Sequence, residues 1–368
     1  MDRFDVAIIG AGMAGASLAA ELAPHARVLL VEAEDTPGYH TTGRSAAFWE
    51  EAYGGPGVYP LTAASGTFLR AHGFLSPRGA LNIGREQDRT KVESFVERFA
   101  SLGARVELVG RDRLAASVPG LKADWVCGSW EPDCADIDVA GLHQHYLAES
   151  RRIGSVLRVR ARVAAVEREG AVWRIAWGDG PDQQAGAMLV VNAAGAWADG
   201  VAKMAGAKPL GIRPLRRTVA QLRVAPAPPV SLPLTLGINE DFYFKPQGDR
   251  LWLSPHDETP DVPRDAAAEE IDVALAIDRF GHVVDWQVEA LERRWAGLRS
   301  FAPDRLPVYG FSKDRPGFFW FAGQGGFGIQ TAPAAARLAA QLLLGLPRDE
   351  MTAQIDADIY TPGRFISG

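Results

Sequence analysis

The sequence is poor in cysteine and contains no long hydrophobic run. Only Cys127 and Cys134 are present among 368 residues, and their spacing matches neither a disulfide framework nor a paired C-x-x-C zinc motif. No stretch reaches the 18 consecutive apolar residues of a transmembrane helix, and the apolar segment at 334–344 contains Arg337. A buried-looking strand at residues 6–9 leaves no room for a cleavable signal. These absences predict a cytoplasmic protein with no metal site and no integral membrane segment.

Positive charge is also scarce. The chain has 39 Lys and Arg residues against 45 Asp and Glu residues, a net charge of -6. A nucleic-acid partner is therefore not expected, because such a partner requires a basic surface to neutralise its phosphates. The length exceeds that of one hydrophobic core and predicts two domains.

The N-terminal segment predicts a dinucleotide site. A strand, a helix and a second strand are expected in the first 32 residues, with Gly10, Gly12 and Gly15 in a G-x-G-x-x-G motif between the first two. The first glycine permits a tight turn, the second lets backbone N–H groups approach a pyrophosphate, and the third allows close helix–strand contact. Glu32, 22 residues after Gly10, is placed to bind ribose hydroxyls and disfavours NADP. The motif alone fits FAD and NAD equally.

The remaining pattern predicts an α/β nucleotide-binding domain of Rossmann type, interleaved with an α+β domain built on an antiparallel sheet. We assign residues 1–55, 140–205 and 300–368 to the first domain, and residues 56–139 and 206–299 to the second. Strands are expected at 6–9, 27–32, 80–83, 125–130, 155–159, 162–167, 172–177, 188–192, 242–244, 251–253 and 318–321, and helices at 13–22, 87–102, from 197 and at 334–344.

Four further segments carry a joint pattern. They are GYHTTGRSAA at 38–47, VNAAGAW at 191–197, WAGLRS at 295–300 and GQGGFGIQT at 323–331. Together they resemble the D-amino acid oxidase and dehydrogenase (DAO) superfamily of FAD-dependent oxidoreductases, over nearly the whole chain. Within that superfamily the chain looks most like D-arginine dehydrogenases. The resemblance implies an FAD-binding domain and a substrate-binding domain with the boundaries given above.

The resemblance also implies which residues contact FAD. The flavin is expected to be non-covalent, because the cysteine of the covalently linked sarcosine-oxidase branch has no counterpart near Gly325. We expect a helix start at 45–49 beside the anionic cofactor and a glycine-dense turn at 325–331 that directs backbone N–H groups at the flavin. A plain surface charge is the alternative reading of Arg44. The implied contacts are Gly10, Gly12, Met13, Ala14, Gly15, Glu32, Arg44, Ser45, Ala47, Val163, Ala194, Gly195, Gly325, Gly326, Phe327, Gly328, Ile329, Gln330 and Thr331.

At the substrate end the resemblance implies that Arg216 and Arg299 bind a carboxylate. Tyr53 and Tyr243 would add phenolic hydrogen bonds, and the Gly326 carbonyl would lie near the substrate amine. Arginine's planar fork suits a carboxylate, and Arg299 follows an apolar run where an unpaired charge is costly. A structural salt bridge would satisfy the same argument.

Two departures from the family pattern bear on substrate choice. Phe48 stands where the D-arginine dehydrogenases have a histidine, and Ala80 stands where they have the glutamate that binds a cationic side chain. A pocket lined by Phe48, Ala80, Leu234 and Leu236 is expected to prefer an apolar or aromatic side chain over D-arginine.

The expected reaction is oxidative deamination of an amino acid, and the resemblance implies one of the D series. Hydride transfer from Cα to flavin N5 would give an imino acid that hydrolyses to a 2-oxo acid and ammonia. Oxidation of a secondary amine, as in sarcosine or glycine oxidases, oxidation of a 2-hydroxy acid, and a non-catalytic flavin-carrying subunit are the alternatives. Oxygen, a quinone or a protein could accept the electrons. Glu50 is expected to be a solvated helix residue, with a restored acidic contact in the pocket as the alternative. His256 is expected to be a loop residue, with an approach to the site as the alternative.

Overall fold

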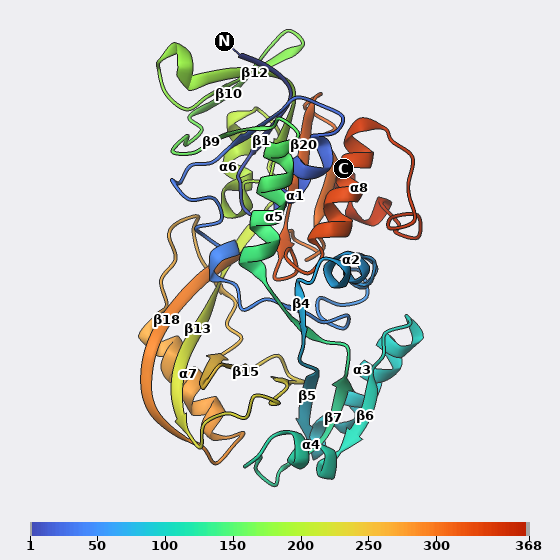
Figure 1. Cartoon of the computed structure of the whole chain (residues 1–368), viewed down its shortest axis with the longest axis vertical. Coiled ribbons are helices and arrows are strands. Elements are labelled where there is room, and N and C mark those ends of the chain that lie inside the picture. Colours follow the sequence, from blue (N-terminus) through green and yellow to red (C-terminus); the bar gives the residue numbers. More distant parts are fainter. Residues whose placement is uncertain (1, 366–368) are drawn as a thin grey trace.

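Two large β-sheets organise the molecule, one in each half of the view in Figure 1. The computed structural model describes residues 2–365. The upper sheet has the order β10-β11-β12-β1-β2-β9, and β20 joins it beside β12 and carries β19. Its strands are β1 (Asp2–Ile9), β2 (Val28–Val31), β9 (Val156–Arg158), β10 (Ala165–Glu169), β11 (Val172–Ala176), β12 (Gln184–Asn192), β19 (Val308–Phe311) and β20 (Phe318–Ala322).

The centre of the upper sheet is parallel, as continuous apolar strands predict. β1 pairs in parallel with β2 on one side and with β12 on the other, and β12 pairs in parallel with β20. Helix α1 (Met13–Leu22) packs against α5 (Val139–Arg152) and α8 (Ala332–Leu344) over this sheet. The predicted strand–helix–strand unit at the N-terminus is therefore confirmed, and so is the Rossmann-type α/β class.

The lower sheet has the order β21-β18-β13-β16-β15-β14-β5-β7-β6, with the short β17 beside β13. It is mainly antiparallel but includes the parallel pair β14 and β5, which departs from the expected antiparallel sheet. Its strands are β5 (Ala80–Arg85), β6 (Glu107–Gly110), β7 (Trp125–Glu131), β13 (Arg213–Ala225), β14 (Leu234–Gly237), β15 (Tyr243–Gln247), β16 (Arg250–Ser254), β17 (Thr259–Pro260), β18 (Gln287–Phe301) and β21 (Gln324–Gly325).

A small third sheet lies between the two halves, with β8 (Ala135–Ile137) between β3 (Phe48–Trp49) and β4 (Leu75–Pro77). The remaining helices surround the sheets. They are α2 (Tyr59–Ala71), α3 (Arg89–Ser101), α4 (Arg111–Ser117), α6 (Ala198–Met204) and α7 (Glu270–Gly281).

The expected helix start at 45–49 is wrong. A short 3-10 turn covers Thr42–Arg44, Ser45 is already extended, and Phe48 and Trp49 form strand β3. β3 forms because Phe48 pairs with Asp136 and Trp49 with Ala135 of β8, partners 88 and 86 positions further along that local sequence does not reveal. The strand expected at 162–167 likewise begins only at Ala165.

The long strands β13 and β18 run together from the junction of the two halves to the lower edge of the molecule (Figure 1). At the junction, β21 pairs with the end of β18 just before the chain enters α8. The segment 318–325 therefore contributes to both sheets, with β20 in the upper one and β21 in the lower one. Within residues 2–365 no helix is long and apolar enough to cross a membrane.

Candidate active site

A cavity of about 370 Å³ lies where the two sheets meet. Its walls come from the glycine loop after β1, the end of β2, the segment after residue 38, the start of α6, the facing strands β13 and β18, and the turn before α8. Lining residues include Gly10, Gly12, Met13, Ala14, Glu32, Arg44, Ser45, Ala47, Phe48, Tyr53, Val163, Ala194, Gly195, Arg217, Tyr243, Arg299, Gly325, Gly326, Gly328, Ile329 and Gln330.

The glycine loop packs closely against the backbone that follows β12. Gly10 has a φ of +102, and an added Cβ would lie 2.5 Å from the Ala193 carbonyl oxygen. Glu32 is held at the end of β2 by N–H groups of Ala11 and Glu34, which donate to its carboxylate at 2.8 and 3.0 Å. The loop and the carboxylate therefore stand together at one end of the cavity, as an adenosine diphosphate site requires.

Gly15 has a packing role instead of lining the cavity. A Cβ at this position would lie 1.8 Å from the Gly10 carbonyl oxygen, so only glycine lets α1 start so close to β1. This matches the part of its predicted role that concerns helix–strand contact.

Arg44 lines the cavity, but its guanidinium is engaged elsewhere. It donates to the carbonyl oxygens of Ala266 at 2.7 Å and Ala296 at 3.2 Å, and it pairs with the Asp265 carboxylate. The side chain therefore connects the loop after residue 38 to the lower half of the molecule. Its positive charge is used in these contacts within the protein.

The turn before α8 supplies the opposite wall. Gly325, Gly326, Gly328, Ile329 and Gln330 line the cavity. Phe327 and Thr331 are absent from the lining. Phe327 packs among Val58, Leu215 and Phe301, and the Thr331 hydroxyl donates to the Phe327 carbonyl at the start of α8.

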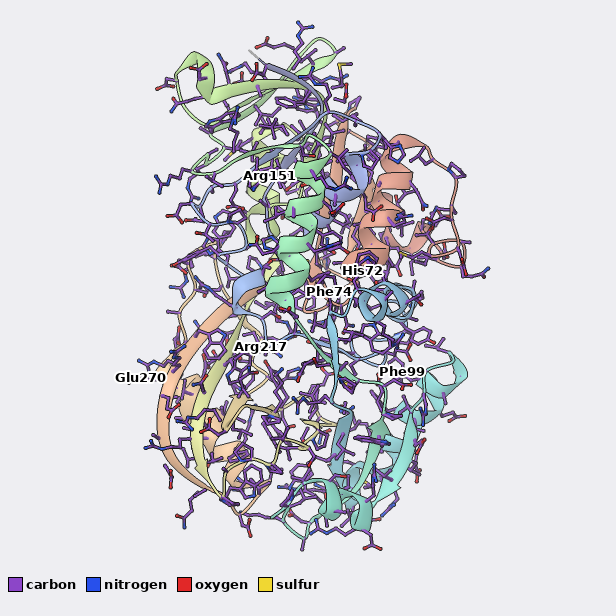
Figure 2. The ribbon with its side chains drawn as sticks, in the orientation of Figure 1. His72, Phe74, Phe99, Arg151, Arg217 and Glu270 are labelled. Atoms are coloured by element: carbon purple, nitrogen blue, oxygen red, sulfur yellow. The ribbon has the colours of Figure 1, made fainter. Side chains whose placement is uncertain are left out.

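Two arginines and two tyrosines meet at the far end of the cavity. Arg217, Arg299, Tyr53 and Tyr243 all line it, and Figure 2 labels Arg217 on β13 close to the junction of the two halves. Gly326 lies among them, because an added Cβ would be 2.7 Å from both Arg299 Nε and the Tyr53 hydroxyl.

Arg216 is not part of this group. It is buried on the other face of β13, where its guanidinium contacts Asp272 at 3.0 Å, Asp261 at 3.7 Å and Glu269. Successive side chains of a strand point to opposite faces, so the neighbouring Arg217 occupies the cavity position predicted for Arg216.

The two cavity arginines have buried donors to spare. Arg299 Nε and Nη1, and Arg217 Nη2, have no hydrogen-bond partner among the described residues. Burial, and then the nearby charge of Arg299, lower the pKa of Arg217 to about 10, so it is still protonated at neutral pH. A buried donor without an acceptor is costly, and an anionic ligand would supply the missing acceptors.

The apolar wall differs from the prediction. Phe48 lines the cavity, with its ring 5.3 Å from that of Tyr53 and 6.2 Å from that of Tyr243. Ala80, Leu234 and Leu236 are buried in a cluster with Tyr243 and Cys134 and do not line the cavity. They pack behind Tyr243 of the wall, since β14 stands next to β15 in the sheet and β5 stands next to β14.

The prediction that Glu50 is solvated is wrong. The residue is 2 % exposed, in the turn after β3, and not a solvated helix residue. Asn82 Nδ2 donates to its carboxylate at 3.3 Å, and burial raises its pKa to about 7. Glu131, also buried, accepts from the N–H groups of Glu51 at 2.6 Å and Ala52 at 3.3 Å.

The backbone of Glu50 is linked to the cavity-lining residue Gln330. The Glu50 N–H donates to Gln330 Oε1 at 3.3 Å, and Gln330 Nε2 donates to the Tyr53 carbonyl at 3.2 Å. Sequence reasoning missed this network, since a Glu-Glu dipeptide carries no local sign of burial. His256 stands outside the lining, as expected, with Nδ1 2.6 Å from the Glu240 carbonyl oxygen.

Comparison with protein families decides the relationship. Residues 5–342 match the family model described as "DAO: FAD dependent oxidoreductase". The chain belongs to the DAO family. As a member, it is an FAD-dependent oxidoreductase.

Relatives of this DAO-family chain match it along its whole length. It is 24% identical to hydrogen cyanide synthase subunit HcnC of Pseudomonas aeruginosa, over 98% of this chain and 96% of that protein. Glycine oxidase from Geobacillus kaustophilus has the same fold, with a TM-score of 0.86, 22% identity and 100% coverage of both chains. L-alpha-glycerophosphate oxidase from Mycoplasma pneumoniae with FAD bound gives a TM-score of 0.84 at 17% identity, over 94% and 95% of the two chains.

The cavity fits the FAD that the family binds. The glycine loop and Glu32 form an adenosine diphosphate end, and the turn before α8 brings glycine backbone to the other end. Cys127 and Cys134 are buried and free, and neither lines the cavity. No cluster of three or more potential metal ligands occurs within the described part of the chain.

Proposed function

We propose that this DAO-family protein catalyses oxidative deamination of an amino acid, with a D-amino acid bearing an apolar or aromatic side chain as the preferred substrate. The observation that carries the proposal is the pair of buried arginines, Arg217 and Arg299, which have unpartnered donors and line the cavity beside Tyr53, Tyr243 and Gly326. Such a pair suits the carboxylate common to all amino acids.

Each protein group would have a defined role. Arg217 and Arg299 would bind and orient the carboxylate, and the two tyrosine hydroxyls would donate further hydrogen bonds. The Gly326 carbonyl would accept from the amine, and the Phe48 ring would exclude water and contact an apolar side chain. Bound FAD supplies the two-electron chemistry by accepting the Cα hydride.

The proposed reaction consists of an oxidation and a hydrolysis. The substrate loses a hydride from Cα and a proton from its amine, which leaves an imino acid. Water then adds to the imine carbon, and ammonia leaves to give the 2-oxo acid. No titratable side chain is assigned to the amine proton, which is released to solvent.

The test is anaerobic bleaching of the purified, FAD-loaded protein by a panel of D- and L-amino acids, N-alkyl glycines and 2-hydroxy acids. We expect bleaching by D-amino acids with apolar side chains and little by D-arginine. Bleaching by N-alkyl glycines or 2-hydroxy acids alone would replace the proposal with the corresponding alternative. A yellow protein that no member of the panel bleaches would indicate a non-catalytic flavin-carrying subunit.

A further inference from the structure

Behind the cavity arginines lies a carboxylate with no role in the proposed reaction. Glu258 Oε1 lies 2.7 Å from Arg305 Nη2, 3.3 Å from Arg299 Nη2 and 3.6 Å from Arg217 Nη2. One oxygen atom thus faces three guanidinium groups. Glu258 does not line the cavity, so it acts on a ligand only through these arginines.

The surrounding arginines favour the ionised form of Glu258. Burial would raise the pKa of its carboxyl, but the hydrogen bond from Arg305 and the charges of Arg299 and Arg217 outweigh burial, and the pKa is lowered. The same arginines act on His256, where burial first and then Arg217 and Arg299 lower the pKa to about 2. His256 is therefore neutral and adds no charge to the group.

The charges at this end can be counted. Arg217, Arg299 and Arg305 are positive, while Glu258 and the nearby Asp257 are negative. Asp257 is occupied by the Thr218 N–H and hydroxyl at 2.7 and 2.9 Å. One positive charge is left over, and it matches a ligand with a single carboxylate.

We propose that Glu258 is a specificity-determining residue, which restricts the cavity to substrates with one carboxylate by neutralising one arginine of the three. Removal of its charge would free the Nη2 donors of Arg299 and Arg305 and raise the surplus to two positive charges. The cavity would then favour dicarboxylic amino or imino acids. This inference rests on the proposed function, because it assumes that Arg217 and Arg299 bind the substrate carboxylate.

The test compares binding of two unreactive probes, propionate and succinate, to the FAD-loaded protein by titration calorimetry. The wild type should bind propionate at least as tightly as succinate. In Glu258→Gln the ratio of the two dissociation constants should shift by about tenfold in favour of succinate. Glu269→Gln is the matched control, since Glu269 pairs with Arg216 outside the cavity, and its ratio should equal that of the wild type.

The outcomes distinguish a failure of the inference about Glu258 from a failure of the proposed function. If propionate binds and the ratio is the same in Glu258→Gln as in the wild type, the inference is wrong while the proposed function stands. If neither probe binds the wild type, the proposed carboxylate site itself is wrong. Should Glu258→Gln fail to fold, Arg305→Gln provides the reverse test. Loss of that cation should weaken propionate binding several-fold, and unchanged binding would overturn the inference.

Discussion

The buried carboxyl of Glu50 should make the stability of the protein depend on pH in a direction opposite to that of ion-paired carboxylates. Its carboxyl receives a hydrogen bond from Asn82, and its Oε2 has no partner within residues 2–365. Burial, and then the charge of Glu50, raise the pKa of the neighbouring Glu131 well above its usual range, although its carboxylate accepts two backbone N–H groups. Both carboxyls therefore favour the protonated form, and a substitution at Glu50 isolates the contribution of that residue.

The magnitude follows from the pKa. Burial raises the pKa of Glu50 from 4.5 to about 7, and each pH unit between the unfolded and folded values corresponds to about 1.4 kcal/mol. Between these values the folded state holds a proton that the unfolded state has released. The free energy of unfolding should therefore fall by about 3 kcal/mol as the pH rises from 4.5 to above 7.

Urea unfolding of the wild type and of Glu50→Gln at pH 5, 6, 7 and 8 measures this effect. The variant cannot ionise at this position, so its stability relative to the wild type should increase by about 3 kcal/mol across the series. Glu97→Gln on the exposed face of α3 is the control and should show no such trend. A difference between Glu50→Gln and the wild type that is constant with pH would refute the reasoning.

Three other predictions concern the cavity. Arg217→Gln should raise KM at least tenfold, since charge-assisted hydrogen bonds contribute about 1.5–3 kcal/mol. Arg216→Gln should instead lower Tm and leave KM unchanged. Steady-state kinetics and thermal unfolding distinguish the two variants. Gly15→Ala should prevent FAD retention, because its Cβ would lie 1.8 Å from a backbone oxygen, and the flavin absorbance of the purified variant checks this. Glu32→Gln should raise the FAD dissociation constant about tenfold, as measured by flavin fluorescence on dilution; equal retention in the variant and the wild type would contradict the ribose assignment.

Sequence patterns predicted the parts of the molecule that depend on short-range regularity. The run of apolar residues in β1, the glycine spacing and Glu32 are local signals, and the structure places them as expected. The choice between Arg216 and Arg217 was not local, because it depends on how β13 is aligned with β18 more than 70 positions further along. The burial of Glu50 depends likewise on Asn82 and Gln330, which come from distant elements.

The adjacent arginines of β13 also raise a question of folding fidelity. A slip of the strand by one residue would still present one guanidinium to each face, so charge alone does not distinguish the native alignment from this error. Contacts of uncharged side chains of β13 must therefore distinguish the native alignment from the slipped one. Leu215 packs with Phe301 and Phe327, and the Thr218 hydroxyl donates to Asp257; a slip would turn both side chains to the wrong face. Side chains that do not line the cavity thus decide which of two identical residues faces it.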